Sequence, residues 1–407
     1  MLSNYENRLR KISCLRQRLV TISRYSSLAL LACLPFLLFY DTSRNIDMQG
    51  LILLVAGALA WLAILLEYRL YFKRWNRINL ILLGIFCGFS LLSSFLNPHI
   101  SESLIGSPLL RLGGLGLLAC VGSGLLLSNF DAKKIIIWTY LLILAVGIFS
   151  IPFSLINFHT LIRAGGVFAQ ADVLGVMFGC GLILGAWILR EYSERNKLLI
   201  ASQTVLLALL ILTETRSVIL ILTILMPLVY YSIFRSWNIA FLGAYLLILV
   251  FGYLALTTYL PSRLTDRGYA HDSIVYRYDL AKSAVKASAK QPLIGYGPGN
   301  IAEGLKCSGL KYRELRQTCA EGYYFNSSHN IFLDRVLGIG WLGGLAYLAI
   351  IILALRNGLA SSKEIRVMAF CLVLIVAYYL TNVTSLALEL LLWVLLFQCL
   401  KPGTIKV

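Results

Sequence analysis

The sequence predicts an all-α, polytopic membrane protein, and three observations point to this fold class. Of the 407 residues, 59% are hydrophobic and only 14% are charged, whereas a soluble domain carries roughly 25% charged residues. Apolar runs recur along the whole chain, each long enough to cross a hydrocarbon core about 30 Å thick. These runs are continuous rather than alternating, so they predict helices and argue against the strands of a membrane barrel.

The apolar runs predict about twelve transmembrane helices, joined by short connections with one exception. Between spans nine and ten lies a long polar stretch, Thr258 to Ser328. We expect one integrated membrane domain with four parts: an amphipathic arm (1–24), spans one to nine (25–257), a large loop that carries the chemistry (258–330), and spans ten to twelve with a tail (331–407). The predicted spans are 25–40, 50–66, 78–96, 109–128, 135–153, 167–189, 198–212, 216–234, 238–257, 331–354, 365–380 and 384–400.

The distribution of Lys and Arg predicts the orientation of these spans. One set of alternate connections, which includes both termini, holds twenty-one Lys and Arg residues. The short connections of the other set hold only Arg44, Arg111, Arg163 and Arg216. Positive residues concentrate in short cytoplasmic loops, whereas long loops escape this rule. Both termini are therefore expected in the cytoplasm, and the long polar stretch on the opposite side.

Composition also limits the partners and cofactors. The net charge of +17 is spread between the spans rather than gathered on one soluble face, which argues against a nucleic-acid partner. Apolar residues recur at helical spacing between arginines, as is typical of a helix on anionic membrane lipids: Leu9, Ile12, Leu15, Leu19 and Ile22. No Cys or His cluster has metal-ligand spacing, so we expect no metal. Cys307 and Cys319 would form a disulfide only in an oxidising compartment, and the sequence leaves that bridge open.

The long polar stretch contains a predicted helix. Apolar residues spaced four, three and four positions apart, from Ile274 to Val285, share one helical face. Asp272 or Ser273 would cap this helix, and the Gln291-Pro292 step would end it. A basic stripe that includes Lys282 runs along the same helix.

A glycine-rich turn follows this helix, with glycines at positions 295, 297 and 299. Glycine permits close approach of the backbone, so Gly297 is a candidate for contact with a substrate. The turn has neither a GxGxxG pattern nor a P-loop lysine, so a plain turn back to the membrane surface is the simpler explanation. The stretch then closes on Ser327-Ser328-His329-Asn330, where the chain becomes apolar again.

His329 gains significance from the arginines that the predicted topology brings to its side of the membrane. Arg163 lies at the outer end of span six, Arg216 begins span eight, and Arg277 lies on the predicted loop helix. Arginine binds pyrophosphate through a fork of donors, and histidine can take a proton from an attacking hydroxyl near neutral pH. This set predicts transfer from a lipid-linked diphosphate to an alcohol. Without such a role, each arginine would anchor a lipid phosphate.

At these residues the chain resembles the bacterial O-antigen ligases of the WaaL type, within the wider O-antigen ligase/polymerase family. The family signature is His, then Asn, Ser or Gln, nine residues, Gly, two residues, Gly, and Thr, Ser or Val. His329-Asn330, Gly340 and Gly343 fit this spacing, with Gly344 in the last position. Further segments match in the family's order: Gly165 to Phe168 with Asp172 (Asp replacing the family's Asn), Thr215-Arg216-Ser217, and Ser273 to Asn300.

The resemblance, which covers about residues 160–345, implies an inverting, GT-C-like glycosyltransferase of the bacterial inner membrane with a periplasmic active site. It would move O-antigen from undecaprenyl diphosphate to the lipid A–core oligosaccharide, with no nucleotide, metal or other cofactor. His329 would be the general base, and Arg216 and Arg277 would hold the diphosphate. The predicted substrate-binding residues are Arg163, Asn330, Lys282 and Gly297.

Several alternatives stay open. A Wzy-type O-antigen polymerase or a protein O-oligosaccharyltransferase would use the same donor class with another acceptor. A transporter of lipid-linked oligosaccharides would also have about twelve spans, but transporters tend to show two repeated halves, which this sequence lacks. Glu389 in span twelve is either a further site residue or a buried structural carboxylate.

Overall fold

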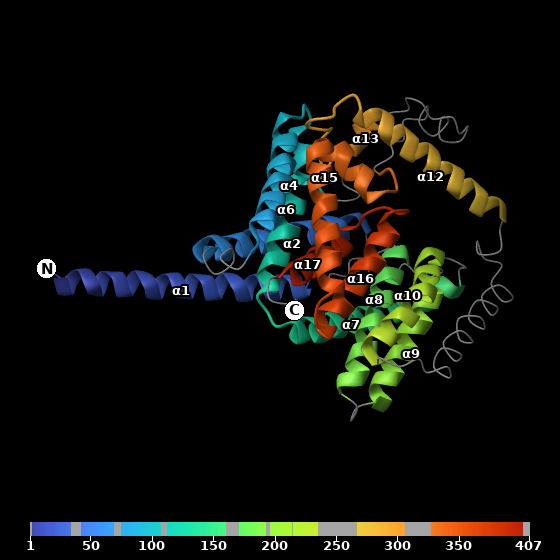
Figure 1. Cartoon of the computed structure of the whole chain (residues 1–407), viewed down its shortest axis with the longest axis horizontal. Coiled ribbons are helices and arrows are strands. Elements are labelled where there is room, and N and C mark those ends of the chain that lie inside the picture. Colours follow the sequence, from blue (N-terminus) through green and yellow to red (C-terminus); the bar gives the residue numbers. More distant parts are fainter. Residues whose placement is uncertain are drawn as a thin grey trace.

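The described part of the protein is entirely helical. A computed structural model describes residues 2–33, 42–68, 75–106, 112–159, 171–192, 196–213, 215–234, 267–305 and 327–401. The all-α prediction is confirmed over these residues (Figure 1). They form fourteen helices: α1 Leu2–Cys33, α2 Thr42–Leu66, α4 Arg77–Leu96, α5 Ile100–Ile105, α6 Gly114–Ser128, α7 Ala132–His159, α8 Ala171–Glu191, α9 Asn196–Leu212, α10 Arg216–Phe234, α12 Arg267–Ser288, α13 Ile301–Gly304, α15 Ile331–Leu359, α16 Lys363–Tyr379 and α17 Leu386–Leu400.

The protein is a polytopic membrane protein. Among the described helices, five have the length and apolar composition needed to cross a membrane: Arg77–Leu96, Ala132–Ile151, Ala171–Glu191, Arg216–Phe234 and Ile331–Leu359. The helices agree with the predicted spans to within a few residues at most of their ends. One difference lies in α1, which joins the predicted arm and the first part of span one in a single helix. The predicted ninth span, 238–257, lies outside the described residues.

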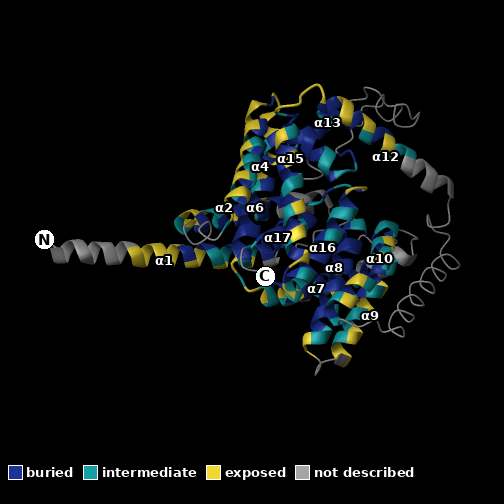
Figure 2. Ribbon diagram, in the orientation of Figure 1, coloured by how far each residue is buried: buried dark blue, intermediate teal, exposed yellow. Residues whose placement is uncertain are grey.

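Helix α8 lies inside the bundle and is buried along almost its whole length (Figure 2). It packs against α7, α9, α10 and α16. Small residues permit these close contacts, because a Cβ atom at Gly179 would lie only 2.8 Å from Cδ2 of Leu374. A helix that is apolar on all sides belongs in such an interior position. The packing fixes the first turn of α8, which carries Asp172.

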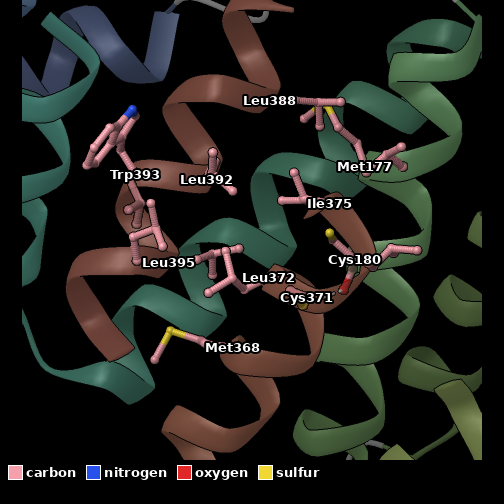
Figure 3. Packing of buried hydrophobic residues seen from close by; sticks show 14 of the residues in the cluster. Met177, Cys180, Met368, Cys371, Leu372, Ile375, Leu388, Leu392, Trp393 and Leu395 are labelled. Carbon is pink, nitrogen blue, oxygen red and sulfur yellow. Dashed lines mark hydrogen bonds between the residues drawn. The ribbon is translucent and has the colours of Figure 1, made fainter. Parts of the chain in front are cut away.

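Helices α8, α16 and α17 share one apolar core (Figure 3). Cys371 of α16 lies against α8, with its Sγ 3.8 Å from the carbonyl oxygen of Cys180. On α17, the ring of Trp393 is fully buried and packs at a tilt against Phe86, with a centroid distance of 5.1 Å. Interiors packed in this way resist small displacements. The ends of these helices are therefore held in fixed relative positions.

The N-terminal helix α1 extends away from the bundle (Figure 1). Its later part is tied to the end of α2, since Arg16 donates to the carbonyl of Leu66 and Arg24 pairs with Glu67. Leu15 and Leu19 are exposed. Attachment of this helix to the membrane surface stays a prediction.

Helix α12 begins earlier than predicted. It starts at Arg267, so Asp272 and Ser273 lie inside the helix and the predicted cap is wrong. The reason is that no helix-breaking residue stands between Gly268 and Asp272. The helix ends at Ser288, just before the predicted Gln291-Pro292 step. The face with Leu280 and Ala284 is buried, while the predicted apolar face around Val285 is exposed.

Helix α15 is broken at Gly340, where the backbone has φ 74° and ψ 174°. The break leaves backbone carbonyl groups of α15 without their usual helical donors. Backbone N–H groups of the loop after α12 donate to these carbonyls instead. The N–H of Tyr296 donates to Leu337 O at 2.7 Å, and the N–H of Gly297 donates to Gly338 O at 2.9 Å. Backbone groups at membrane depth must be satisfied inside the protein. The loop therefore supplies the hydrogen-bond donors that the carbonyls at the break need, and the break supplies acceptors for the N–H groups of the loop.

Two further contacts complete this junction. The N–H of Trp341, just after the break, donates to Pro292 O at 2.8 Å. From α4, Ser93 Oγ donates to Gly338 O at 2.6 Å. The loop 291–300 is thus bound to both sides of the break, and α12 is fixed relative to α15. Figure 1 shows α12 and α13 together at one end of the bundle.

We expect Gly340→Ala to destabilise the protein. A Cβ atom there would overlap the carbonyl oxygen of Leu293, and the positive φ alone strains a residue with a side chain by about 1–3 kcal/mol. The thermal unfolding midpoint in detergent should fall by several degrees. Gly88→Ala on α4 is the matched control, because a Cβ atom there meets no atom within 4 Å. Equal midpoints for the two variants would contradict this account of the break.

Candidate functional site

His329 lies in the segment 327–330 that leads into α15, and its backbone has φ 59°. This left-handed conformation is uncommon outside glycine and costs about 1–3 kcal/mol unless the surroundings hold it. Asp334 in the first turn of α15 holds the preceding residues. Its Oδ2 accepts from Ser327 Oγ at 2.6 Å, and its Oδ1 accepts from both N and Oγ of Ser328 at 2.7 Å. Ser327 Oγ also accepts from the N–H of His329 at 3.0 Å.

The imidazole of His329 is half-buried against α12. The ring of Tyr276 meets it edge-on, with a centroid distance of 5.6 Å and an interplanar angle of 78°. The Nδ1 atom of His329 is buried and has no hydrogen-bond partner among the described residues. One ring nitrogen of His329 is therefore not engaged by the described part of the protein.

The surroundings of His329 keep its ring neutral. The pKa of His329 is lowered from its usual 6.5 to about 4, chiefly by burial and in addition by the positive charge of Arg277. The carboxylate of Asp172 opposes both effects, since it raises this pKa. Burial also raises the pKa of the neighbouring Tyr276 hydroxyl, so that group stays protonated. At neutral pH the imidazole is thus a proton acceptor rather than a cation.

Arg277 connects three elements of the site. From α12, its Nη2 donates to Oδ1 of Asn382 at 3.3 Å. Asn382 lies in the connection between α16 and α17, and its Nδ2 donates to Tyr378 O at 3.1 Å. The same Nδ2 lies 3.5 Å from Oγ of Ser217, the residue after Arg216 on α10. Asn382 therefore links the elements that carry the two predicted diphosphate-binding arginines.

Arg216 is the half-buried first residue of α10, and the turn before it is anchored in the core. Thr213 and Thr215 are buried, and their Oγ1 atoms lie 2.9 Å apart. Oγ1 of Thr215 donates to Ala171 O, at the start of α8, at 3.4 Å. The start of α10 is thereby fixed beside the start of α8, which carries Asp172. Arg216, Arg277 and His329, predicted to meet, are connected through neighbouring residues.

The other predicted substrate-binding residues lie in different settings. Lys282 is exposed on α12. The N–H of Gly297 is occupied by Gly338 O at the α15 break. Asn330 caps α15: its Oδ1 accepts from the Leu333 N–H at 3.1 Å. Binding roles for these three residues stay predictions. Arg163, Cys307 and Cys319 lie outside the described residues.

Glu389 is fully buried in the first turn of α17. Its Oε1 lies 2.6 Å from Nη2 of Arg335, which is itself buried on α15. The same oxygen accepts from Nε1 of Trp393 at 3.2 Å. Charges inside a membrane protein are retained when they are paired in this way. This geometry favours the structural explanation of Glu389.

Three residues of the site were not predicted. Asp334 had a usable signal, because a carboxylate one turn inside an apolar span needs partners. Tyr276 stands next to Arg277, yet nothing in the sequence indicates that its ring would meet His329. Asn382 gave no signal at all, since a polar residue between two spans is ordinary.

The fold and the site together define a class of protein. It is an integral membrane protein in which the first residue of α10 (Arg216), an arginine of α12 (Arg277) and a neutral histidine before α15 (His329) are linked. Such a site suits an anionic, lipid-linked substrate and a hydroxyl that must lose a proton. Across the described residues, no group of three or more His, Cys, Asp or Glu side chains could hold a metal ion.

Comparison with known proteins agrees with this class. Residues 201–348 match the family described as O-antigen ligase. This segment is similar to that family, which includes the WaaL ligases and the Wzy polymerases. The match confirms the resemblance and implies a glycosyl-transfer enzyme with lipid-linked O-antigen substrates. None of the curated proteins compared with the chain matches it.

We expect the pH dependence of glycosyl transfer to follow the pKa of His329. For a base with a pKa of about 4, kcat/KM should stay flat from about pH 8 to about pH 5 and fall below that as the ring is protonated. Arg277→Gln removes a charge that lowers this pKa. The fall of kcat/KM at low pH, here called the acid limb, should therefore move to higher pH. Asp172→Asn should move it to lower pH.

Each profile should be normalised to its own maximum, so that a loss of rate is separated from a shift of the limb. Lys290→Gln, at an exposed position after α12, is the control and should leave the limb in place. Identical limbs for the parent, Arg277→Gln and Asp172→Asn would contradict this electrostatic account.

Proposed function

We propose that the protein is an O-antigen ligase of the bacterial inner membrane. It would transfer O-antigen polysaccharide from undecaprenyl diphosphate to the lipid A–core oligosaccharide at the periplasmic face. The observation that carries the proposal is the neutral His329 beside Arg277, within the segment that matches the family. Arg216 is linked to this pair through Ser217 and Asn382.

The proposed reaction is a single displacement with inversion. A hydroxyl oxygen of the acceptor sugar attacks the anomeric carbon of the O-antigen, and its proton passes to the imidazole of His329. The new bond joins the acceptor oxygen to that carbon, and the bond from the carbon to the diphosphate oxygen breaks. The leaving group is undecaprenyl diphosphate, whose negative charge Arg216 and Arg277 would stabilise. Fixed cations at a developing anion are a major source of transition-state stabilisation.

The proposed roles follow from what each side chain can do. Arginine stays charged in any surroundings and matches the oxygens of a phosphate through two parallel donors. Histidine accepts a proton only when it is neutral, and burial beside Arg277 favours that form. The same positive charge would stabilise the departing diphosphate. One arginine would thus serve both the base and the leaving group.

We also propose a twelve-span, GT-C-like arrangement with both termini in the cytoplasm. Its supports are the agreement between predicted spans and described helices and the excess of Lys and Arg in one set of connections. In this arrangement the starts of α10 and α15 face the periplasm, together with α12. The four-part division into 1–24, 25–257, 258–330 and 331–407 belongs to the same proposal. No cofactor is assigned.

The nearest alternative is a Wzy-type polymerase or a protein O-oligosaccharyltransferase. All three activities would use the same donor class and the same base. They differ in the acceptor: lipid A–core, a growing O-antigen chain, or a protein hydroxyl. The test must therefore identify the product and not only the use of the donor.

The test is complementation of a strain that lacks its own ligase. We expect the parent protein to restore O-antigen ladders on lipopolysaccharide gels, and His329→Ala to abolish them, because loss of a general base lowers the rate about 10²–10⁴-fold. His99→Ala, at an exposed histidine that precedes α5, is the matched control and should retain the ladders. Membrane levels of the three proteins should be compared by immunoblot.

Two outcomes would contradict the proposal in different ways. Full ladders with His329→Ala would exclude this residue as the base. No ladder with a well-expressed parent would argue against lipid A–core as the acceptor. Restoration of ladders in a polymerase-deficient strain would then identify a polymerase.

A further inference from the structure

The first turn of α15 contains two consecutive buried charged residues that face different partners. Asp334 is 2% exposed and holds Ser327 and Ser328 through three hydrogen bonds of 2.6 to 2.7 Å. Arg335 is 3% exposed and pairs with Glu389 of α17 at 2.6 Å. The carboxylates of Asp334 and Glu389 therefore both form bonds at the start of α15. Of the two, Asp334 is the one that contacts the segment carrying His329.

Asp334 is not needed to begin the helix. Asn330 already caps α15, since its side chain accepts from the N–H of Leu333 at 3.1 Å. All three donors to Asp334 come from the two residues directly before His329, outside the helix. A buried carboxylate is costly, and it is retained where its hydrogen bonds have a specific use. Its use here is to hold the chain that leads into His329.

The hydrogen bonds form a continuous path from Asp334 to the backbone of His329. Ser327 Oγ donates to Asp334 Oδ2 and accepts from the His329 N–H at 3.0 Å. His329 stands at φ 59°, a conformation that persists only where the surroundings determine it. In this conformation its ring meets Tyr276 edge-on. Without the path, the segment would relax to ordinary backbone angles and turn the imidazole away.

We propose that Asp334 is a positioning residue, which fixes the left-handed backbone of His329 through Ser327 and Ser328 and so aims the imidazole into the site. The proposal rests on the proposed function only in taking His329 as the general base. Positioning of this kind matters because a displacement of about 1 Å can lower a rate about 10²-fold.

The variants are Asp334→Asn and Ser327→Ala, each with a matched control. Asp334→Asn keeps the size of the side chain but replaces one acceptor oxygen by an amide donor that faces serine donors. Glu389→Gln is its control, because it also neutralises a buried carboxylate near α15 without contacting the His329 segment. Ser327→Ala removes the path itself. Its control is Ser90→Ala on α4, a buried serine whose Oγ bonds only within its own helix, to Phe86 O at 2.8 Å.

Two independent measurements report on the position of the His329 imidazole. In the purified protein with lipid-linked donor and rough lipopolysaccharide, Asp334→Asn and Ser327→Ala should lower kcat about 10²-fold per folded molecule, with KM for the donor changed less than about threefold. In the protein without substrate, NMR of labelled histidines should follow the titration of His329, assigned by its loss in His329→Ala. Its pKa should rise in both variants by at least one unit toward 6.5, because a displaced ring is better hydrated.

The controls decide between positioning and general stability. Glu389→Gln and Ser90→Ala should change the unfolding midpoint without moving the His329 titration or kcat per folded molecule. An unchanged titration in Asp334→Asn and Ser327→Ala would overturn the proposal, as would a shift of equal size in their controls. Because the titration needs no substrate, it tests the positioning role even if the parent shows no ligase activity. Absence of ligase activity in the parent would contradict the proposed function but not the positioning role of Asp334.

Discussion

A broken membrane helix exposes backbone groups that a bilayer cannot satisfy, and the arrangement of this protein depends on how it meets that requirement at Gly340. The carbonyls of Leu337 and Gly338 receive hydrogen bonds from Tyr296 and Gly297, in the loop that follows α12. This junction ties α12 to α15. Arg277 projects from α12 and His329 precedes α15, so the same junction sets the distance between a cation and the proposed base. The glycines of the family signature thus have a structural reason in this chain.

The site itself is a balance of charge and burial. A half-buried histidine beside an arginine has a lowered pKa, while the carboxylate of Asp172 limits that lowering. Asn382 accepts from Arg277 and approaches Ser217, so the amide places two cationic elements together without adding a negative charge. Because Asn382 is neutral, its hydrogen bond does not cancel the charge of Arg277.

Much of this arrangement could be predicted from the sequence, for reasons that differ between residues. Apolar runs predict α4, α9 and α10 closely, because a membrane span must be both long and apolar. Charge distribution predicts that Arg216 and Arg277 lie on the side of His329. The fold of the loop is less accessible. Local capping signals place the start of α12 at Asp272 instead of Arg267, and the glycine turn predicts a substrate contact or a plain turn but not its pairing with α15.

The remaining features depend on contacts between distant segments. The pairing of loop 291–300 with the break at Gly340 joins residues 41 to 49 positions apart, and no local pattern indicates it. Asn382 lies 105 positions from Arg277. Left-handed backbone at His329 follows from the hydrogen bonds of Asp334, which become visible only when both residues are placed. Propensity and periodicity describe single segments, so they predict helices better than the joints between them.

The most direct test of the central claim is a structure of the protein with undecaprenyl diphosphate bound, determined by cryo-electron microscopy in lipid nanodiscs. The account predicts that the diphosphate lies within hydrogen-bond distance of the guanidinium groups of Arg216 and Arg277. The imidazole of His329 should face the space next to the terminal phosphate, where an acceptor hydroxyl would approach. A diphosphate bound away from both arginines, with His329 turned toward the protein interior, would contradict it.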